Sequence, residues 1–233
     1  LFHDMARGAE DTAHAANMAI VLGHSDDDPA VEARYLRVMA EHRVDGILLV
    51  PTPTTTSMDM PYLPARVELV LLDRRPTGVE ASMVSCNTRS AARDLCHHLF
   101  ALDRTRIAIV GGIPEMQTWL DRLEGYLDAH RETGRIIDDS LITTGNYRAE
   151  AGIDAVRKLM ALPEPPEAII AASTQVLDGV LEELAVHGLR VPEDIAVSCV
   201  DDPGFPMFFR PRITFVEQPG YAMGAEAVRL LMS

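Results

Sequence analysis

The chain has 233 residues, of which 47% are hydrophobic and 24% charged, a composition that excludes disordered, collagen-like and small disulfide-rich proteins. Its 35 acidic and 21 basic residues give a formal net charge of −14, which opposes attraction to phosphate and so excludes DNA binding by this chain alone. No apolar run approaches the ~18 residues of a membrane-spanning helix. The three cysteines lack CxxC spacing and suit a reducing compartment better than a disulfide framework.

Short apolar runs alternate with longer amphipathic stretches along the chain. Strands are predicted, in chain order, over residues 19–23, 46–50, 68–72, 106–110, 168–172 and 195–199, with a strand-like piece at 81–84. Helices, with apolar positions three and four residues apart, are predicted over residues 4–16, 31–42, 89–101, 119–131, 149–162, 174–187 and 221–232. This alternation is typical of an α/β fold in which helices cover both faces of a parallel sheet.

The number of strand–helix units predicts more than one core. About six such units exceed what one compact core usually holds, so we predict two doubly wound parallel-sheet lobes. The chain passes from the strand-like piece into a helix near Cys86 to Thr88 without a long linker, as a crossover between packed lobes would. A doubly wound lobe normally begins with a strand, whereas this chain opens directly into a helix. We therefore expect the sequence to start inside its domain.

Motifs of common catalytic and metal sites are missing or wrongly spaced. There is no G-x-S-x-G nucleophile elbow, and no cysteine lies in a protease-like context. Cys96, His97 and His98 are consecutive in a predicted helix, where side chains point about 100° apart and cannot converge on one ion. His98 is interpreted as a packed histidine. We predict no catalytic residue, no metal and no cofactor.

Two further motifs have a structural interpretation. Asp26-Asp27-Asp28 lacks the central glycine and terminal glutamate of a calcium-binding loop, and helix capping with solvated charge accounts for it. Gly111-Gly112 follows a strand without a phosphate-loop fingerprint, and a tight strand-to-helix turn accounts for it.

Polar residues at the carboxyl ends of predicted strands remain as candidates for a binding site. Asp73 and Asp201-Asp202 directly follow strands, at the edge where open α/β sheets place their ligands. A carboxylate there can accept hydrogen bonds from the vicinal hydroxyls of a polyol or sugar, and Arg122 could supply the complementary donors. The alternative is that these aspartates cap helices or pair with arginines for structural reasons.

A series of motifs then occurs in a fixed order along nearly the whole chain. It comprises LFHDMARG at 1–8, RVDGILL at 43–49, VLLDR at 70–74, RIAIVGG at 106–112, RLEGY at 122–126 and GLRVPEDIAV at 188–197, followed by Asp201-Asp202, Thr214 and Gln218-Pro219. Together these motifs resemble the effector-binding portion of lactose-repressor-type (LacI/GalR) transcriptional regulators.

The resemblance implies two lobes of the periplasmic-binding-protein type joined by three crossovers, with a small effector in the cleft between them. It assigns residues 1–86 with 219–233 to the N-terminal lobe and residues 87–218 to the C-terminal lobe. The family's helix-turn-helix headpiece and hinge have no counterpart in this chain. The acidic balance agrees, because the basic DNA-reading part would lie upstream.

The resemblance also implies a set of effector-binding residues. Phe2, Asp73, Arg122 and Asp201 fall where family members commonly touch the effector, while Thr118 and Trp119 lie one turn before Arg122 and would line the cleft. For Trp119, a packed helix aromatic and a stacking platform are both open interpretations. Ser173 completes the set, at a position where the family often has an Asn that holds a sugar hydroxyl.

Two departures from the family pattern remove polar groups. Ser173-Thr174 stands where these regulators usually carry Asn-Asp, and Cys86 stands where they often have an aspartate near the lobe crossover. Both changes weaken the prediction of a free sugar as the effector, relative to another small polar molecule.

The predicted function is that of the effector-binding and dimerisation domain of a cytoplasmic repressor, without catalysis. Its predicted partners are a small polar effector such as a sugar, a second copy in a homodimer, and operator DNA through the missing headpiece. Phe205, Phe208 and Phe209, beside Pro206 and Pro211, form an apolar patch that suits either a dimer face or a lid over the effector.

Two functions of other classes compete with this prediction. A periplasmic-type sugar- or solute-binding protein of a transporter shares the two-lobe architecture, and an upstream secretory signal would identify it. The second competing function is that of an enzyme. No catalytic motif supports it, and turnover of a bound ligand would be evidence for it.

Overall fold

A computed structural model describes residues 1–56, 67–205, 210 and 212–233. The chain has an α/β fold with parallel sheets, as predicted, and it divides into two compact units. The first comprises Leu1–Cys86 with Pro219–Ser233, and the second comprises Asn87–Gln218. The predicted patch at Phe208 and Phe209 lies outside the described residues.

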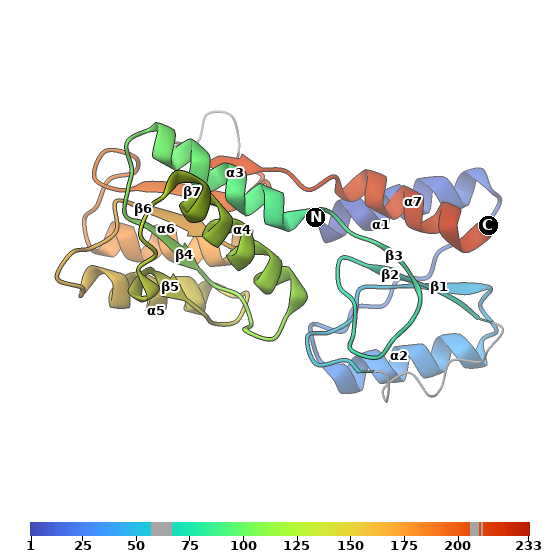
Figure 1. The fold of residues 1–233 in the computed structure, drawn as a ribbon. Coiled ribbons are helices and arrows are strands. Elements are labelled where there is room, and N and C mark those ends of the chain that lie inside the picture. Colours follow the sequence, from blue (N-terminus) through green and yellow to red (C-terminus); the bar gives the residue numbers. More distant parts are fainter. Residues whose placement is uncertain (57–66, 206–209, 211) are drawn as a thin grey trace. The chain divides into compact units, whose positions relative to one another are not determined.

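The first unit is built on a parallel sheet with the strand order β1-β2-β3. Its elements are α1 (Phe2–Ala15), α2 (Pro29–Glu41), β1 (Gly46–Leu49), β2 (Glu68–Leu72), β3 (Ser82–Val84) and α7 (Gly220–Met232). Helices α1 and α7 lie side by side on one face, where Met5 and Met223 pack against Val70, while α2 packs on the other face through Leu36 against Leu71 (Figure 1).

The second unit is built on a parallel sheet with the order β5-β4-β6-β7-β8. Its elements are α3 (Thr88–Ala101), β4 (Ile107–Val110), α4 (Gln117–Thr133), the short 3-10 helix η2 (Asp139–Leu141), β5 (Ile142–Thr143), α5 (Ala149–Met160), β6 (Ala168–Ala171), α6 (Thr174–Val186), β7 (Ala196–Val200) and β8 (Thr214–Val216). Side chains alternate along β4: Ile107 and Ile109 pack against α3 and α4, whereas Ala108 and Val110 pack against α5 and α6.

Helices that share a face of a sheet touch through glycines. A Cβ at Gly224 of α7 would lie 1.9 Å from the Met5 carbonyl oxygen of α1, and one at Gly125 of α4 would lie 2.0 Å from the Arg89 carbonyl oxygen of α3. A Cβ at Gly179 of α6 would likewise lie 1.8 Å from the Ala149 carbonyl oxygen of α5. These distances exclude any side chain, so each helix pair packs backbone against backbone.

The predicted strand over residues 19–23 is wrong. This segment has no regular structure, and the side chains of Val21 and Leu22 are 73% and 64% exposed. A strand needs a hydrogen-bonded neighbour, and within the described ranges the one ladder partner of β1 is β2. Residues 19–23 form no ladder with β1 or with any other described strand, so their apolar pattern does not produce a strand. The sequence also missed β5 and β8, which have two and three residues.

Several motifs have the structural roles expected of them. Asp28 caps α2 by accepting hydrogen bonds from the backbone N–H groups of Ala30 and Val31 at 2.8 and 3.3 Å. Gly111 and Gly112 form the turn between β4 and α4 with φ of +93° and +107°, which favour glycine.

No helix within residues 1–56, 67–205 or 212–233 combines the length and apolarity needed to cross a membrane.

The GLRVPEDIAV motif forms the turn between α6 and β7. Gly188 follows α6 with φ of +70°, and Arg190 then holds Asp194 through Nε and Nη2, both at 2.8 Å. These hydrogen bonds from Arg190 lower the pKa of the Asp194 carboxyl to about 2. The motif therefore has a structural role at the amino end of β7, away from the edge where ligands bind in this fold class.

We expect Gly179→Ala to destabilise the protein. Glycine to alanine in an exposed helix stabilises by up to about 1 kcal/mol, but here the new Cβ meets the backbone of α5. Such overpacking costs about 1–3 kcal/mol or more. Urea denaturation measures the change, with the exposed Glu182→Ala on the same helix as the control; a stabilised Gly179→Ala variant would contradict the backbone contact.

The Arg190–Asp194 pair predicts a pH-dependent contribution to stability. Because the pKa of Asp194 is lowered in the folded state, the stabilisation is fully present above its usual value near 3.8 and is lost as the pH falls toward 2. Asp194→Asn should therefore lower the melting temperature at neutral pH, and its difference from the wild type should shrink below about pH 4. Glu193→Gln, which removes the adjacent exposed charge, is the control. A difference that does not change with pH would contradict the assignment.

Candidate functional site

A polar cluster in the second unit forms around Arg122 of α4. This side chain is 5% exposed, and its Nη1 donates hydrogen bonds to the Ala172 carbonyl oxygen at 2.8 Å and the Tyr147 hydroxyl at 3.3 Å. Its Nε is buried and makes no hydrogen bond with a described residue. Ala172 follows β6 directly, so the guanidinium lies at the carboxyl edge of the sheet.

Tyr147 and Thr118 complete the cluster. The two hydroxyl oxygens lie 3.2 Å apart, and the guanidinium carbon of Arg122 lies 5.5 Å from the centre of the Tyr147 ring. The sequence analysis missed Tyr147, because it lies between the two-residue strand β5 and α5. Recognition of Ile142 and Thr143 as a strand would have placed Tyr147 just past its carboxyl end.

Trp119 is placed in the core rather than at the surface. Its side chain is 1% exposed, and its ring packs on Gly112, where a Cβ would lie 2.2 Å from the ring. The first turn of α4 is therefore held against the strand-to-helix turn. Any effect of Trp119 on a ligand acts through the position of Thr118 and Arg122.

Ser173 and Asp201 occupy the ends of the neighbouring strands β6 and β7. The Ser173 hydroxyl oxygen accepts a hydrogen bond from Val176 N–H at 3.3 Å and so caps α6. Asp201 follows β7 with φ of +94°, and its N–H donates to the Val216 carbonyl oxygen at 2.9 Å. Because β6 and β7 are paired, both residues lie at the same edge of the sheet as Arg122.

The first unit has its own polar cluster, around Arg74. Asp73 is 8% exposed with φ of +63°, and its Oδ2 lies 3.4 Å from Nε of Arg74. Arg74 Nη1 also donates to the Pro51 carbonyl oxygen at 3.2 Å and to Asp27 Oδ1 at 3.3 Å. Its guanidinium carbon lies 5.8 Å from the centre of the Phe2 ring. Arg74, which the sequence analysis did not single out, therefore brings Phe2 and Asp73 together.

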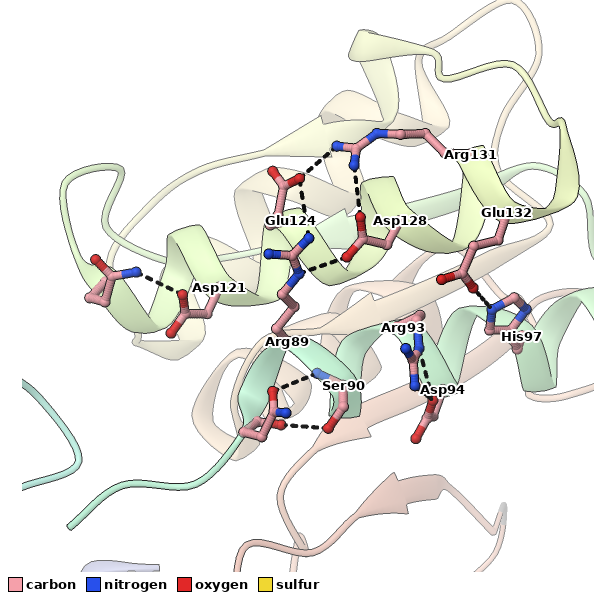
Figure 2. Close-up of polar contacts among 12 residues, drawn as sticks. Arg89, Ser90, Arg93, Asp94, His97, Asp121, Glu124, Asp128, Arg131 and Glu132 are labelled. Carbon is pink, nitrogen blue, oxygen red and sulfur yellow. Dashed lines mark hydrogen bonds and ion pairs between the residues drawn. The ribbon is translucent and has the colours of Figure 1, made fainter.

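A larger charged network lies on the outer surface of α3 and α4 (Figure 2). Arg89 Nε lies 2.6 Å from Asp128 Oδ2, and Arg131 reaches both Asp128 and Glu124 at 2.7 Å. The hydrogen bond from Arg89 holds the pKa of the Asp128 carboxyl below its usual range. These charges are exposed and paired with one another, so the network joins the two helices and leaves no group free to bind a ligand.

Comparisons with known proteins agree on one family. The profile of the periplasmic binding protein-like domain matches residues 96–233. The catabolite control protein A of Priestia megaterium is 31% identical, across 99% of this chain and 70% of its own length. The HTH-type transcriptional repressor CytR of Escherichia coli (strain K12) is 28% identical, across 99% of this chain and 68% of its own. A solved complex of the transcriptional regulator CelR with cellobiose has a TM-score of 0.84 and 29% identity, and covers 99% of this chain and 71% of that one.

The cluster predicts that Arg122 does not stabilise the fold. Removal of a buried charge that lacks a counter-charge relieves its desolvation cost, and this gain offsets the loss of the hydrogen bonds to the Ala172 carbonyl and the Tyr147 hydroxyl. We therefore expect Arg122→Met to change the free energy of unfolding by less than about 1 kcal/mol, or to raise it. Arg157→Met is the contrasting variant, because it leaves the buried Glu183 carboxylate without its 3.0 Å partner. A marked loss of stability in Arg122→Met alone would assign Arg122 a structural role.

Proposed function

Because the chain belongs to the lactose-repressor-type family of transcriptional regulators, we propose that it is the effector-binding and dimerisation domain of such a repressor. It senses a small polar molecule and controls operator binding allosterically. The observation that supports this best is the convergence of Arg122, Tyr147 and Thr118 at the carboxyl edge of a parallel sheet. Open α/β sheets bind small ligands at this edge.

Each proposed effector contact follows from the chemistry of its residue. Arg122 donates to oxygen atoms of the effector, and Thr118 and Ser173 offer hydroxyls. Asp201 accepts from effector hydroxyls, as does Asp73 in the first unit, where Phe2 adds an apolar surface. Trp119 supports the set from the core by fixing the first turn of α4.

The proposed mechanism is a shift of population rather than a chemical reaction. An effector that binds one arrangement of the protein better than another favours that arrangement by the difference in its two binding free energies. No residue then has to act as an acid, a base or a nucleophile. The curated relatives are named as a transcriptional repressor, CytR, and a catabolite control protein, which favours this function over that of a transporter's solute-binding protein.

We further propose that the protein acts in the cytoplasm as a twofold homodimer, since palindromic operators are read by paired headpieces. The operator contacts are proposed to lie outside this acidic segment, which spans about 68–70% of the length of the curated relatives it matches. The net charge of −14 disfavours binding of phosphate by its surface as a whole.

A panel of candidate effectors tests the proposal. Sugars, sugar phosphates, polyols, nucleobases and organic acids are screened by the melting temperature of the chain. A bound effector at 100 times its Kd stabilises the native state by about 2.7 kcal/mol. We expect one class to raise the melting temperature of the wild type, with a smaller rise in Tyr147→Phe and none in Arg122→Met.

Arg131→Met, which removes an exposed arginine from the same helix, is the control and should keep the full rise. An equal rise in Arg122→Met and the control would place the effector elsewhere. No rise with any class, together with turnover of a panel compound, would overturn the proposal in favour of an enzyme.

A further inference from the structure

A cluster of rings joins the carboxyl-terminal ends of α3 and α4. The side chain of His130 on α4 is 2% exposed, and the centre of its ring lies 5.1 Å from that of Phe100 on α3 and 4.3 Å from that of Tyr126 on α4. Phe100 and Tyr126 both belong to the core of the second unit. His130 is therefore a titratable group inside the contact between two helices, and the proposed function gives it no role.

The hydrogen bond of the His130 ring identifies its neutral form. Nδ1 lies 2.9 Å from the backbone carbonyl oxygen of Tyr126, and a carbonyl oxygen can only accept, so Nδ1 carries the proton. A second proton would bind Nε2 and place a full charge in the core. Burial disfavours that charge, and it lowers the pKa of His130 below its ordinary value near 6.5 despite the opposite effect of the hydrogen bond.

A fixed cation faces the same rings from the segment that follows α4. The guanidinium carbon of Arg135 lies 4.4 Å from the centre of the Phe100 ring, against which His130 packs at an angle of 81°. The buried Nε of Arg135 makes no hydrogen bond with a described residue, and no ion pair links its guanidinium to a described carboxylate. A protonated His130 would therefore meet a second positive charge across one aromatic ring.

The other titratable groups packed around these rings offer His130 no counter-charge. The ring of His97 on α3 lies 6.5 Å from that of Phe100, but its Nε2 lies 2.7 Å from the Glu132 carboxylate on the outer surface (Figure 2). The groups on the inner side are neutral or paired with one another: the Cys96 thiol and the Tyr126 hydroxyl, whose pKa values burial raises, and the Arg106–Asp138 ion pair at 3.1 Å. Acidification therefore adds a paired charge at His97 and an unpaired one at His130.

We propose that Phe100, Tyr126 and His130 form an acid-sensitive latch between the ends of α3 and α4. Nε2 of His130 takes a proton from solvent, the charged ring leaves Phe100 for water, and the last turns of the two helices separate. The stabilisation by the closed latch is fully present above about pH 6.5, the ordinary value for histidine, and is lost as the pH falls below it, because the open form binds the proton more tightly.

The first half of α4 should stay in place when the latch opens. Its two anchors are the contact of Gly125 with the backbone of Arg89 and the packing of the Trp119 ring on Gly112. Neither contact depends on a titratable side chain. Opening is therefore a local change at the helix ends rather than unfolding of the second unit.

NMR of the wild-type protein tests the latch directly. The carbon-bound Cε1 proton of His130, assigned by its loss in His130→Phe, is titrated from about pH 8 to about pH 5 and should titrate below pH 6.5. Over the same range, amide hydrogen exchange corrected for its intrinsic rate should show protection of residues 126–133 falling by as much as about tenfold per pH unit. Residues 117–122 should remain protected, and the fluorescence of Trp119, the single tryptophan of the chain, should not change.

Three variants separate the latch from general acid sensitivity. His130→Phe keeps a ring but cannot take a proton, so its protection should not depend on pH in this range. Arg135→Gln removes the facing charge and should make the loss of protection smaller. His97→Gln, which removes the neighbouring exposed histidine, is the matched control and should behave as the wild type.

Three results would overturn the latch. The first is a His130 signal that titrates at or above pH 6.5, and the second is a loss of protection that persists in His130→Phe. The third is a change in Trp119 fluorescence that accompanies the loss of protection, because it would show that the whole of α4 unfolds. Should His130→Phe fail to fold, the wild-type titration and Arg135→Gln still decide the question.

Discussion

The direct backbone contact between paired helices is the constraint on which the rest of the structure depends. Gly125 of α4 meets the Arg89 carbonyl of α3, and Gly112 meets the Trp119 ring one turn before Arg122. Helix α4 is thus fixed on both sides of Arg122, against a neighbouring helix and against the end of β4. A guanidinium on a helix held at two points has little freedom to leave the sheet edge, which is the preorganisation a binding site needs. The RLEGY motif therefore joins Arg122, the proposed effector contact, and its packing glycine Gly125 in a single helical turn.

A fixed helix also explains how the fold tolerates a buried cation. The outer surface of α3 and α4 is joined by exposed ion pairs, each of which contributes little by itself. The inner surface of α4 contributes Trp119 and Tyr126, which are fully buried. Packing of this kind outweighs the cost of one uncompensated guanidinium. Functional sites commonly retain such locally unfavourable groups, because the rest of the domain stabilises them.

The sequence was sufficient for the fold class and for each α-helix of the described residues, because α-helices depend on local apolar periodicity. The sequence was insufficient for strands, because a strand forms only where another strand lies beside it. Residues 19–23 have the apolar pattern of a strand but no described ladder partner, and β5 and β8 are too short to produce a pattern. The residues of the candidate site likewise fall into those that the sequence could predict and those that only the structure reveals. Asp73 and Asp201 could be predicted from their place after strands, whereas Tyr147 and Arg74 are recognised only by what they touch, since contacts between distant segments leave no local signal.

Among the described residues β1 pairs only with β2, and this has a consequence for the behaviour of the purified chain. Its residues, Gly46 to Leu49, are uncharged, and the segment before α2 exposes Val21 and Leu22. Natural sheets protect such borders with charge, proline or a bulge. None of these interrupts β1. Concentrated solutions should therefore tend toward edge-to-edge association and precipitation. At low salt the repulsion between chains of net charge −14 opposes this association, whereas added salt screens the repulsion and should promote it.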